Sequence, residues 1–214
     1  KEHADFGAAV KSAHDRLGLN AVSAQLPIGE AETFHGIVDL IENKAYTFSG
    51  KGMEEKSTEA AIPVEMKEAV ASARARLMEE AATGDEALMN KFLESGDLTV
   101  AEIRKGLCER VVQGDLSPVF CCSAYHNQGV KEVLDEVVDI LPSPLDVKPA
   151  VGRSTNGGAD VVCAPDAGQP SAALVFKTLS EQHLGDLLLV RIYSGHLEAG
   201  KDLVNTTRNR PEKL

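Results

Sequence analysis

Apolar residues recur along this chain at two different spacings. A spacing of three or four residues, which places side chains on one face of a helix, runs from Phe6 to Leu17, from Met66 to Ala81 and from Val130 to Leu141. Short apolar or alternating runs predict strands at 21–28, 34–40, 45–48, 118–121, 171–179 and 186–193. Strands and helices are therefore mixed in the first part of the chain, whereas the last part contains strands alone.

Two further helices are predicted from their start signals. Thr83 to Glu86 and Thr99 to Glu102 both match the capping box, in which a Thr and a Glu side chain satisfy backbone N–H groups reciprocally. The helices would begin near Glu86 and Ala101. The helix that contains Met66 would begin at Pro63, since proline is well placed at a first helical position.

The most informative stretch runs from Pro118 to Val147. An apolar run of strand length is followed by a loop that begins with Ser123 and Ala124, and then by a helical stripe that Pro142 ends. The period changes from 2 to 3.6 across the loop, so the stretch predicts a strand, a loop and a helix. By themselves Ser123 and Ala124 are only small residues at a turn, and their significance depends on the flanking sequence.

A domain boundary is predicted in the residues after that helix. Residues 148–170 are rich in Gly, Pro and small side chains, and they hold little that could pack in a core. We therefore expect a first domain at 1–149, a linker at 150–169 and the start of a second domain at 170–214.

Composition excludes several classes of protein. An apolar content of 43% over 214 residues is that of a folded chain, and no apolar run approaches the ~20 residues that span a membrane. The four Cys form no Cys-x-x-Cys pair, and the six His form no His-Glu-x-x-His motif. We therefore expect reduced thiols and no metal site.

The charge of the chain is uneven. The formal net charge is −11, and residues 151–214 hold seven basic and seven acidic side chains, so the whole excess falls in residues 1–150. An acidic first part is a poor candidate for contact with a nucleic-acid backbone. It suits either a basic protein partner or a solvated acidic surface.

Several motifs occur in the order in which they occur in translational GTPases of the elongation factor G type. Residues 118–147 resemble the last strand–loop–helix unit of the GTP-binding domain. Residues 25–29, 34–40, 88–94 and 98–103 resemble the G′ insert of that family, and 191–200 resemble a hairpin of its domain II barrel. The chain is similar to this family or to a divergent paralogue, since Cys122 stands where Gly is usual.

The resemblance implies an α/β fold. It would consist of a partial P-loop GTPase domain with an α+β G′ insert at about 21–114, followed by a truncated translation-factor β-barrel. The first residues resemble those directly after the family's Asn-Lys-x-Asp motif. The chain is therefore expected to be an internal piece of a longer protein.

The resemblance also implies a nucleotide contact and a set of partners. Ser123 and Ala124 would be the cofactor-binding residues: the Ala124 N–H would donate to guanine O6, and the Ser123 hydroxyl would brace the loop. The parent would bind GTP or GDP with Mg²⁺. Its partners would be the ribosome, the ribosomal stalk protein through the G′ insert, and ribosomal RNA through domain II, with no membrane and no DNA. Its location would be cytoplasmic.

Two motifs of that family are absent from the chain. It contains neither Gly-x-x-x-x-Gly-Lys-Ser/Thr, which cradles phosphates and Mg²⁺, nor Asn-Lys-x-Asp. We therefore expect no catalytic residue, no metal ligand and no nucleotide bound to this chain alone. A release-factor or ribosomal-protection relative remains an alternative, as does a non-catalytic acidic interaction module derived from a GTPase.

Overall fold

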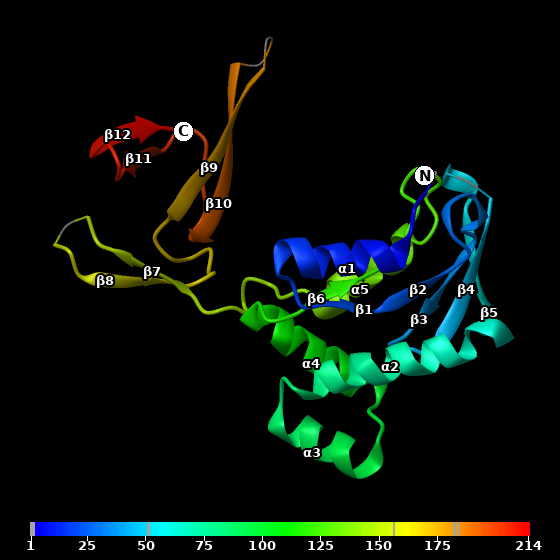
Figure 1. The fold of residues 1–214 in the computed structure, drawn as a ribbon. Helices are drawn as coiled ribbons and strands as arrows, with labels where there is room; N and C mark the ends of the chain where they lie inside the picture. Colours follow the sequence, from blue (N-terminus) through cyan, green and yellow to red (C-terminus); the bar gives the residue numbers. More distant parts are fainter. Residues whose placement is uncertain (1–2, 51, 156, 182, 184) are drawn as a thin grey trace. The chain divides into compact units, whose positions relative to one another are not determined.

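The structure is a computed structural model that describes residues 3–50, 52–155, 157–181, 183 and 185–214. The chain divides into two compact units, Lys1–Pro142 and Ser143–Leu214. Helices and strands are mixed in the first unit, whereas the described residues of the second unit form strands and turns (Figure 1). The predicted mixed α/β class is confirmed.

A short parallel pair of strands connects distant parts of the first unit. Strand β1 (Ala21–Ser23) pairs with β6 (Ser117–Val119), with Ala21 opposite Ser117. Helix α1 (Phe6–Leu17) precedes β1, and helix α5 (Val130–Ile140) follows β6. We call the segment between β1 and β6 the insert; the sequence predicts an insert at about 21–114, which also takes in β1.

The insert begins with an antiparallel sheet in the order β2-β3-β4-β5. Its strands are β2 (Gln25–Ile28), β3 (Gly36–Asp39), β4 (Lys44–Ser49) and β5 (Lys56–Ala60). Strand β5 lies at the edge of the sheet and is almost wholly exposed, so its sequence lacks the apolar alternation that predicts a strand. The sequence analysis misses it for that reason. Short 3₁₀ turns lie at Ala31–Thr33, Gly52–Glu54 and Val64–Met66.

Three helices complete the insert: α2 (Lys67–Ala82), α3 (Glu86–Ser95) and α4 (Val100–Gln113). The capping box at Thr99 and Glu102 is confirmed. The box predicted at Thr83 is wrong, because Asp85 caps α3 by accepting hydrogen bonds from the amides of Ala87 and Leu88. Pro63 precedes a 3₁₀ turn rather than α2 itself.

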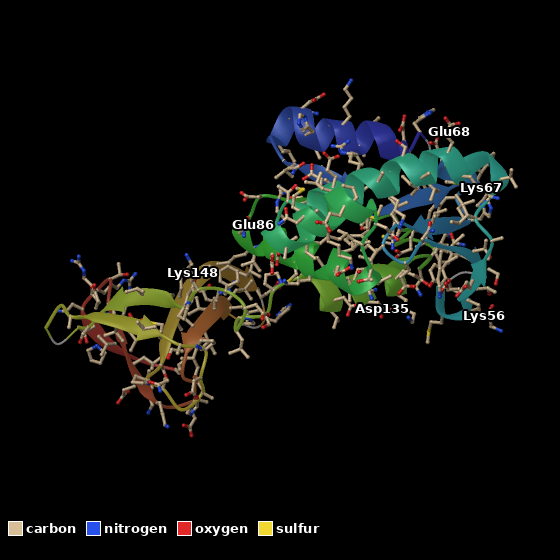
Figure 2. The ribbon with its side chains drawn as sticks, turned by 90° about the horizontal axis from the view of Figure 1, so that it is seen from below. Lys56, Lys67, Glu68, Glu86, Asp135 and Lys148 are labelled. Atoms are coloured by element: carbon tan, nitrogen blue, oxygen red, sulfur yellow. The ribbon has the colours of Figure 1, made fainter. Side chains whose placement is uncertain are left out.

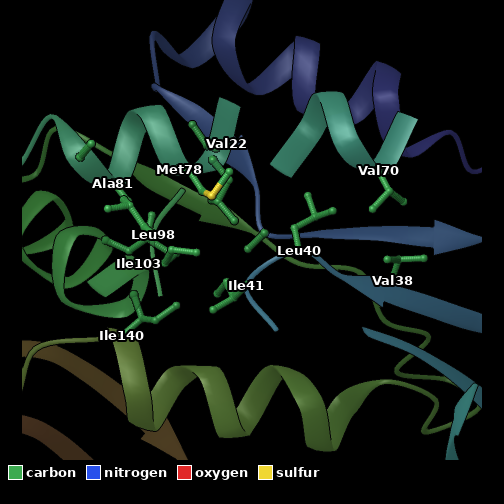
Figure 3. Close-up of a cluster of buried hydrophobic side chains, with 14 of the residues drawn as sticks. Val22, Val38, Leu40, Ile41, Val70, Met78, Ala81, Leu98, Ile103 and Ile140 are labelled. Atoms are coloured by element: carbon green, nitrogen blue, oxygen red, sulfur yellow. The ribbon is translucent and has the colours of Figure 1, made fainter. Parts of the chain in front are cut away.

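One hydrophobic core joins the insert to the rest of the first unit. It contains Leu40 and Ile41 beside β3, Leu77 of α2, Ile103 of α4 and Ile140 of α5, all nearly inaccessible to solvent (Figure 3). Residue Ala24 connects the two sheets, since its amide donates to Val119 O and its carbonyl accepts from the Leu40 amide, both at 2.9 Å. The insert is therefore packed and hydrogen-bonded against β1, β6 and α5.

The described residues of the second unit form three antiparallel strand pairs: β7 (Ala150–Arg153) with β8 (Asp160–Cys163), β9 (Ala172–Glu181) with β10 (Gly185–Ser194), and β11 (Asp202–Asn205) with β12 (Arg210–Lys213). The stretch 150–169, which the sequence predicts to be a linker, holds the first of them. Its strands are short and largely exposed, so they pair through the backbone without the apolar content that marks a packed strand.

Charged side chains lie on the surface of both units. In the first unit Lys67, Glu68, Glu86 and Asp135 are exposed, and Figure 2 shows them projecting from their helices. In the part of the chain that the structure describes, no helix combines the length and the apolar character needed to cross a membrane.

Candidate functional site

The predicted base-contact residues lie in a closed turn between β6 and α5. Ser123 forms an isolated antiparallel bridge with Gln128: the Ser123 amide donates to Gln128 O at 2.8 Å, and the Gln128 amide donates to Ser123 O at 3.1 Å. The His126 amide also donates to Ser123 O, at 3.1 Å. Residues 123–128, which we call the base-contact loop, are thus closed into a turn by backbone hydrogen bonds of their own.

Within this loop the Ala124 amide is available to a ligand. Ala124 is exposed, and its N–H has no acceptor among the described residues, although its carbonyl accepts from the Asn127 amide at 3.3 Å. The Ser123 hydroxyl likewise makes no hydrogen bond within the described part of the chain. The bracing expected of that hydroxyl is instead supplied by the backbone bonds of Ser123.

A cavity of about 500 Å³ borders the loop. Its walls come from three places: the start of α1, with Asp5 and Phe6; the insert, with Pro27 and Phe34; and the loop, with Ala124. The described lining residues include carboxylates but no Lys or Arg, so they suit an uncharged heterocycle better than a phosphate. A second cavity of about 440 Å³ shares Phe34 and Ser123 with the first.

Tyr125 lines both cavities and is not among the site residues that the sequence predicts. Its side chain is 93% exposed, it borders both cavities, and its ring packs edge-on against His126 with centroids 5.0 Å apart. An exposed aromatic ring offers a stacking surface for a planar base. The signal in the sequence was the aromatic residue directly after Ser123 and Ala124.

Two ionisable side chains beside the loop, those of Cys121 and Asp5, have structural surroundings that account for them. Burial is the main cause that raises the pKa of the Cys121 thiol far above its usual value, so Cys121 stays neutral, and its amide donates to Gln25 Oε1 at 3.2 Å. Asp5 accepts a hydrogen bond from the Ala8 amide at 2.8 Å and caps α1. No cluster of His, Cys, Asp and Glu in the described residues is arranged to hold a metal ion.

Comparison with known proteins extends this picture over the whole chain. No family model matches it. Elongation factor G of Mycoplasma pneumoniae is 41% identical over all 214 residues, and the chain spans 31% of the length of that relative. A crystal structure of a protein from Thermus thermophilus superposes with a TM-score of 0.72 and 27% identity, over 98% of this chain and 28% of that one.

The comparisons confirm two predictions made from the sequence: the α/β fold class and the resemblance to translational GTPases of the elongation factor G type. The chain is similar to elongation factor G over all 214 of its residues.

Proposed function

We propose that this chain contributes the guanine-reading part of the nucleotide site in a GTPase of the elongation factor G type. The observation that carries the proposal is the unpaired Ala124 N–H at the rim of a cavity of about 500 Å³, beside the exposed ring of Tyr125 and with no acceptor among the described residues. The ring and the cavity would hold a planar base, and the amide would read one of its edges.

A single amide at that position discriminates between the purines. Guanine presents an acceptor at O6, to which the Ala124 N–H donates. Adenine presents an amino group at the same place, so two donors would face each other and remain unpaired. Because two donors that face each other gain no hydrogen bond and lose their contacts with water, adenine would bind more weakly than guanine.

The rest of the GTPase reaction depends on residues outside this chain. The described lining of the two cavities has no Lys or Arg to pair with phosphate, and the sequence has no P-loop. In the parent protein, other segments would hold the phosphates and Mg²⁺ and would supply the hydrolytic machinery. This chain would bind and orient the base, and GTP hydrolysis would drive translocation on the ribosome.

The partners follow from the same proposal. The relative's name, elongation factor G, places it in translation, and we extend that role to the parent of this chain, acting on the ribosome in the cytoplasm. The acidic insert would meet the ribosomal stalk protein, and the strand-rich second unit would meet ribosomal RNA.

The proposal can be tested with the full-length protein and two nucleotides. GDP should bind at least tenfold more tightly than the diphosphate of 2-aminopurine riboside, which lacks both O6 and the N1 proton, because the Ala124 N–H would then face no acceptor. ADP should bind more weakly still. Equal affinities for GDP and the 2-aminopurine nucleotide would contradict the assignment.

A further inference from the structure

The insert contacts the base-contact loop directly, through backbone groups of Gly50 and Gly52. The Gly52 amide donates to His126 O at 2.9 Å, and the Asn127 side-chain amide donates to Gly52 O at 3.0 Å. The Gln128 side chain reaches Gly50 O at 3.4 Å. Three consecutive loop residues are thus joined to the connection between β4 and β5, which lies far earlier in the chain.

Asn127 makes one of these contacts with its side chain. Its backbone has a φ of 59°, a left-handed conformation that Asn tolerates better than other side-chain-bearing residues. In this conformation its own amide donates to Ala124 O at 3.3 Å while its side chain donates to Gly52 O. One residue therefore connects the peptide of Ala124 with the backbone of the insert.

Just after the loop, Gly129 lies close to Phe48 of the insert, and this close approach also holds the loop against the insert. Gly129 caps α5 with a φ of 74°, and a Cβ added there would lie 3.3 Å from Cζ of Phe48 in β4 and 3.0 Å from Cys121 O. Little space is left between the loop and the insert on this side. The loop is consequently held by β4 and its following residues as well as by its own bridge.

We propose that Asn127 is a positioning residue through which the insert sets the conformation of the base-contact loop. Its hydrogen bond to Gly52 O holds residues 123–128 against the insert and so fixes the direction in which the Ala124 N–H points. The consequence for nucleotide affinity rests on the proposed function, whereas the ordering of the loop does not. Since coupling between sites is reciprocal, a nucleotide that orders the loop also orders Gly52.

Asn127→Asp tests the proposal with little steric change. Asp keeps the size of Asn and its tolerance for left-handed backbone, but it has no N–H₂ donor and sets a carboxylate against the Gly52 carbonyl. Asn43→Asp is the matched control. Asn43 has a φ of 57° in the turn between β3 and β4, and among the described residues it makes no hydrogen bond to the loop.

The measurement is amide hydrogen exchange on the chain 1–214. In Asn127→Asp the amides of Ser123, Gln128 and Gly52 should exchange about tenfold faster, the factor that corresponds to one lost hydrogen bond. The amide of Leu77, in the core helix α2, should be unchanged, which separates a local effect from global unfolding. Asn43→Asp should leave all four amides unchanged. Equal exchange at the loop in wild type and Asn127→Asp overturns the proposal.

A second measurement follows the effect to the ligand. In the full-length protein Asn127→Asp should bind GDP about tenfold more weakly than wild type, and Asn43→Asp should bind it normally. Unchanged GDP affinity in Asn127→Asp would overturn the link between Asn127 and the base. Equal affinities for GDP and the 2-aminopurine nucleotide would contradict the proposed base contact. The positioning role of Asn127 would then be tested by the hydrogen-exchange result alone.

Discussion

Arg104 of α4 donates a hydrogen bond of 2.8 Å from Nη2 to Oε1 of Glu136 in α5. The same nitrogen lies 3.2 Å from Asp139 Oδ2 and 3.4 Å from Glu42 Oε1. The insert contributes Arg104 and Glu42, whereas α5 contributes Glu136 and Asp139. One cation therefore joins the insert to the helix that follows the base-contact loop, and it does so at a carboxylate that is only 4% exposed.

The stability of the first unit should depend on pH through Glu136. Burial raises the pKa of this carboxyl above its usual 4.5, and the hydrogen bond from Arg104 opposes that shift without cancelling it. Since the folded-state pKa exceeds the unfolded one, the stability contributed by Glu136 is fully present below pH 4.5 and is lost as pH rises through the folded pKa. Glu136→Gln should therefore be less destabilising at pH 8 than at pH 5, as measured by urea denaturation.

Removal of the Arg104 cation should destabilise the first unit with the opposite pH dependence, more at high pH than at low pH. Arg104→Met leaves Glu136 buried and without its cation, so we expect a loss of about 2 kcal/mol at pH 8 and a smaller loss at pH 5, where Glu136 is closer to its neutral form. Lys105→Met is the control, because Lys105 pairs with Asp85 at the solvent-exposed surface and its removal should change stability little. Identical pH profiles for the two variants would argue against this account of Glu136.

Gly106→Ala should destabilise the insert. A Cβ at Gly106 would lie 2.1 Å from Ala81 O, so α2 and α4 would have to separate, at a cost of about 1–3 kcal/mol. Gly7→Ala is a matched control within a helix, since its nearest neighbour would be 3.5 Å away and Ala favours the helix by about 0.5–1 kcal/mol. In a thermal unfolding experiment, Gly106→Ala should have a lower melting temperature than wild type, whereas Gly7→Ala should not.

The two threonines that match the capping-box pattern should respond differently to substitution. Thr99→Ala removes a side chain that accepts from the Glu102 amide and should cost about 1 kcal/mol. Thr83 only bonds back to Glu79 O within α2, so Thr83→Ala should change the free energy of unfolding by no more than about 0.5 kcal/mol. Denaturant titration of the two variants compares them directly, and equal losses would mean that the Thr99 cap is not stabilising.

In the full-length protein Ser123→Pro should weaken GDP binding more than Ser123→Ala. Proline removes the amide that donates to Gln128 O and so opens the loop, whereas Ala removes a hydroxyl that has no partner in the described residues. We expect at least a tenfold loss of affinity for the first variant and little change for the second. Equal affinities would show that the closed turn does not shape the base site.

The chain 1–214 alone should bind guanine nucleotides no more tightly than millimolar. Its base-contact loop offers backbone amides such as that of Ala124, but the described cavity walls hold no Lys or Arg and the sequence has no P-loop, and these are the features that bind phosphate. Titration with a fluorescent GDP analogue measures the affinity. Micromolar binding would contradict the prediction, because it would require a phosphate site that the sequence motifs do not indicate.

The sequence by itself determined several helices of this protein, because helix periodicity and capping depend on residues close together in the chain. The helical stripe from Val130 to Leu141 and the capping box at Thr99 each depend on residues three or four positions apart, so they could be predicted before any tertiary contact was known. The position of Ser123 and Ala124 between a strand and a helix followed from the change of period around them. The family resemblance then indicated their chemistry.

Tertiary structure decided what the local patterns could not. Strand β5 has no apolar face because it forms a polar edge, and its pairing with β4 alone makes it a strand. Asp85 rather than Thr83 begins α3, since α2 continues to Ala82 and leaves Thr83 at its end. The bonds from Gly52 to the base-contact loop and from Arg104 to Glu136 join residues 75 and 32 positions apart, and only folding brings such groups within hydrogen-bond distance.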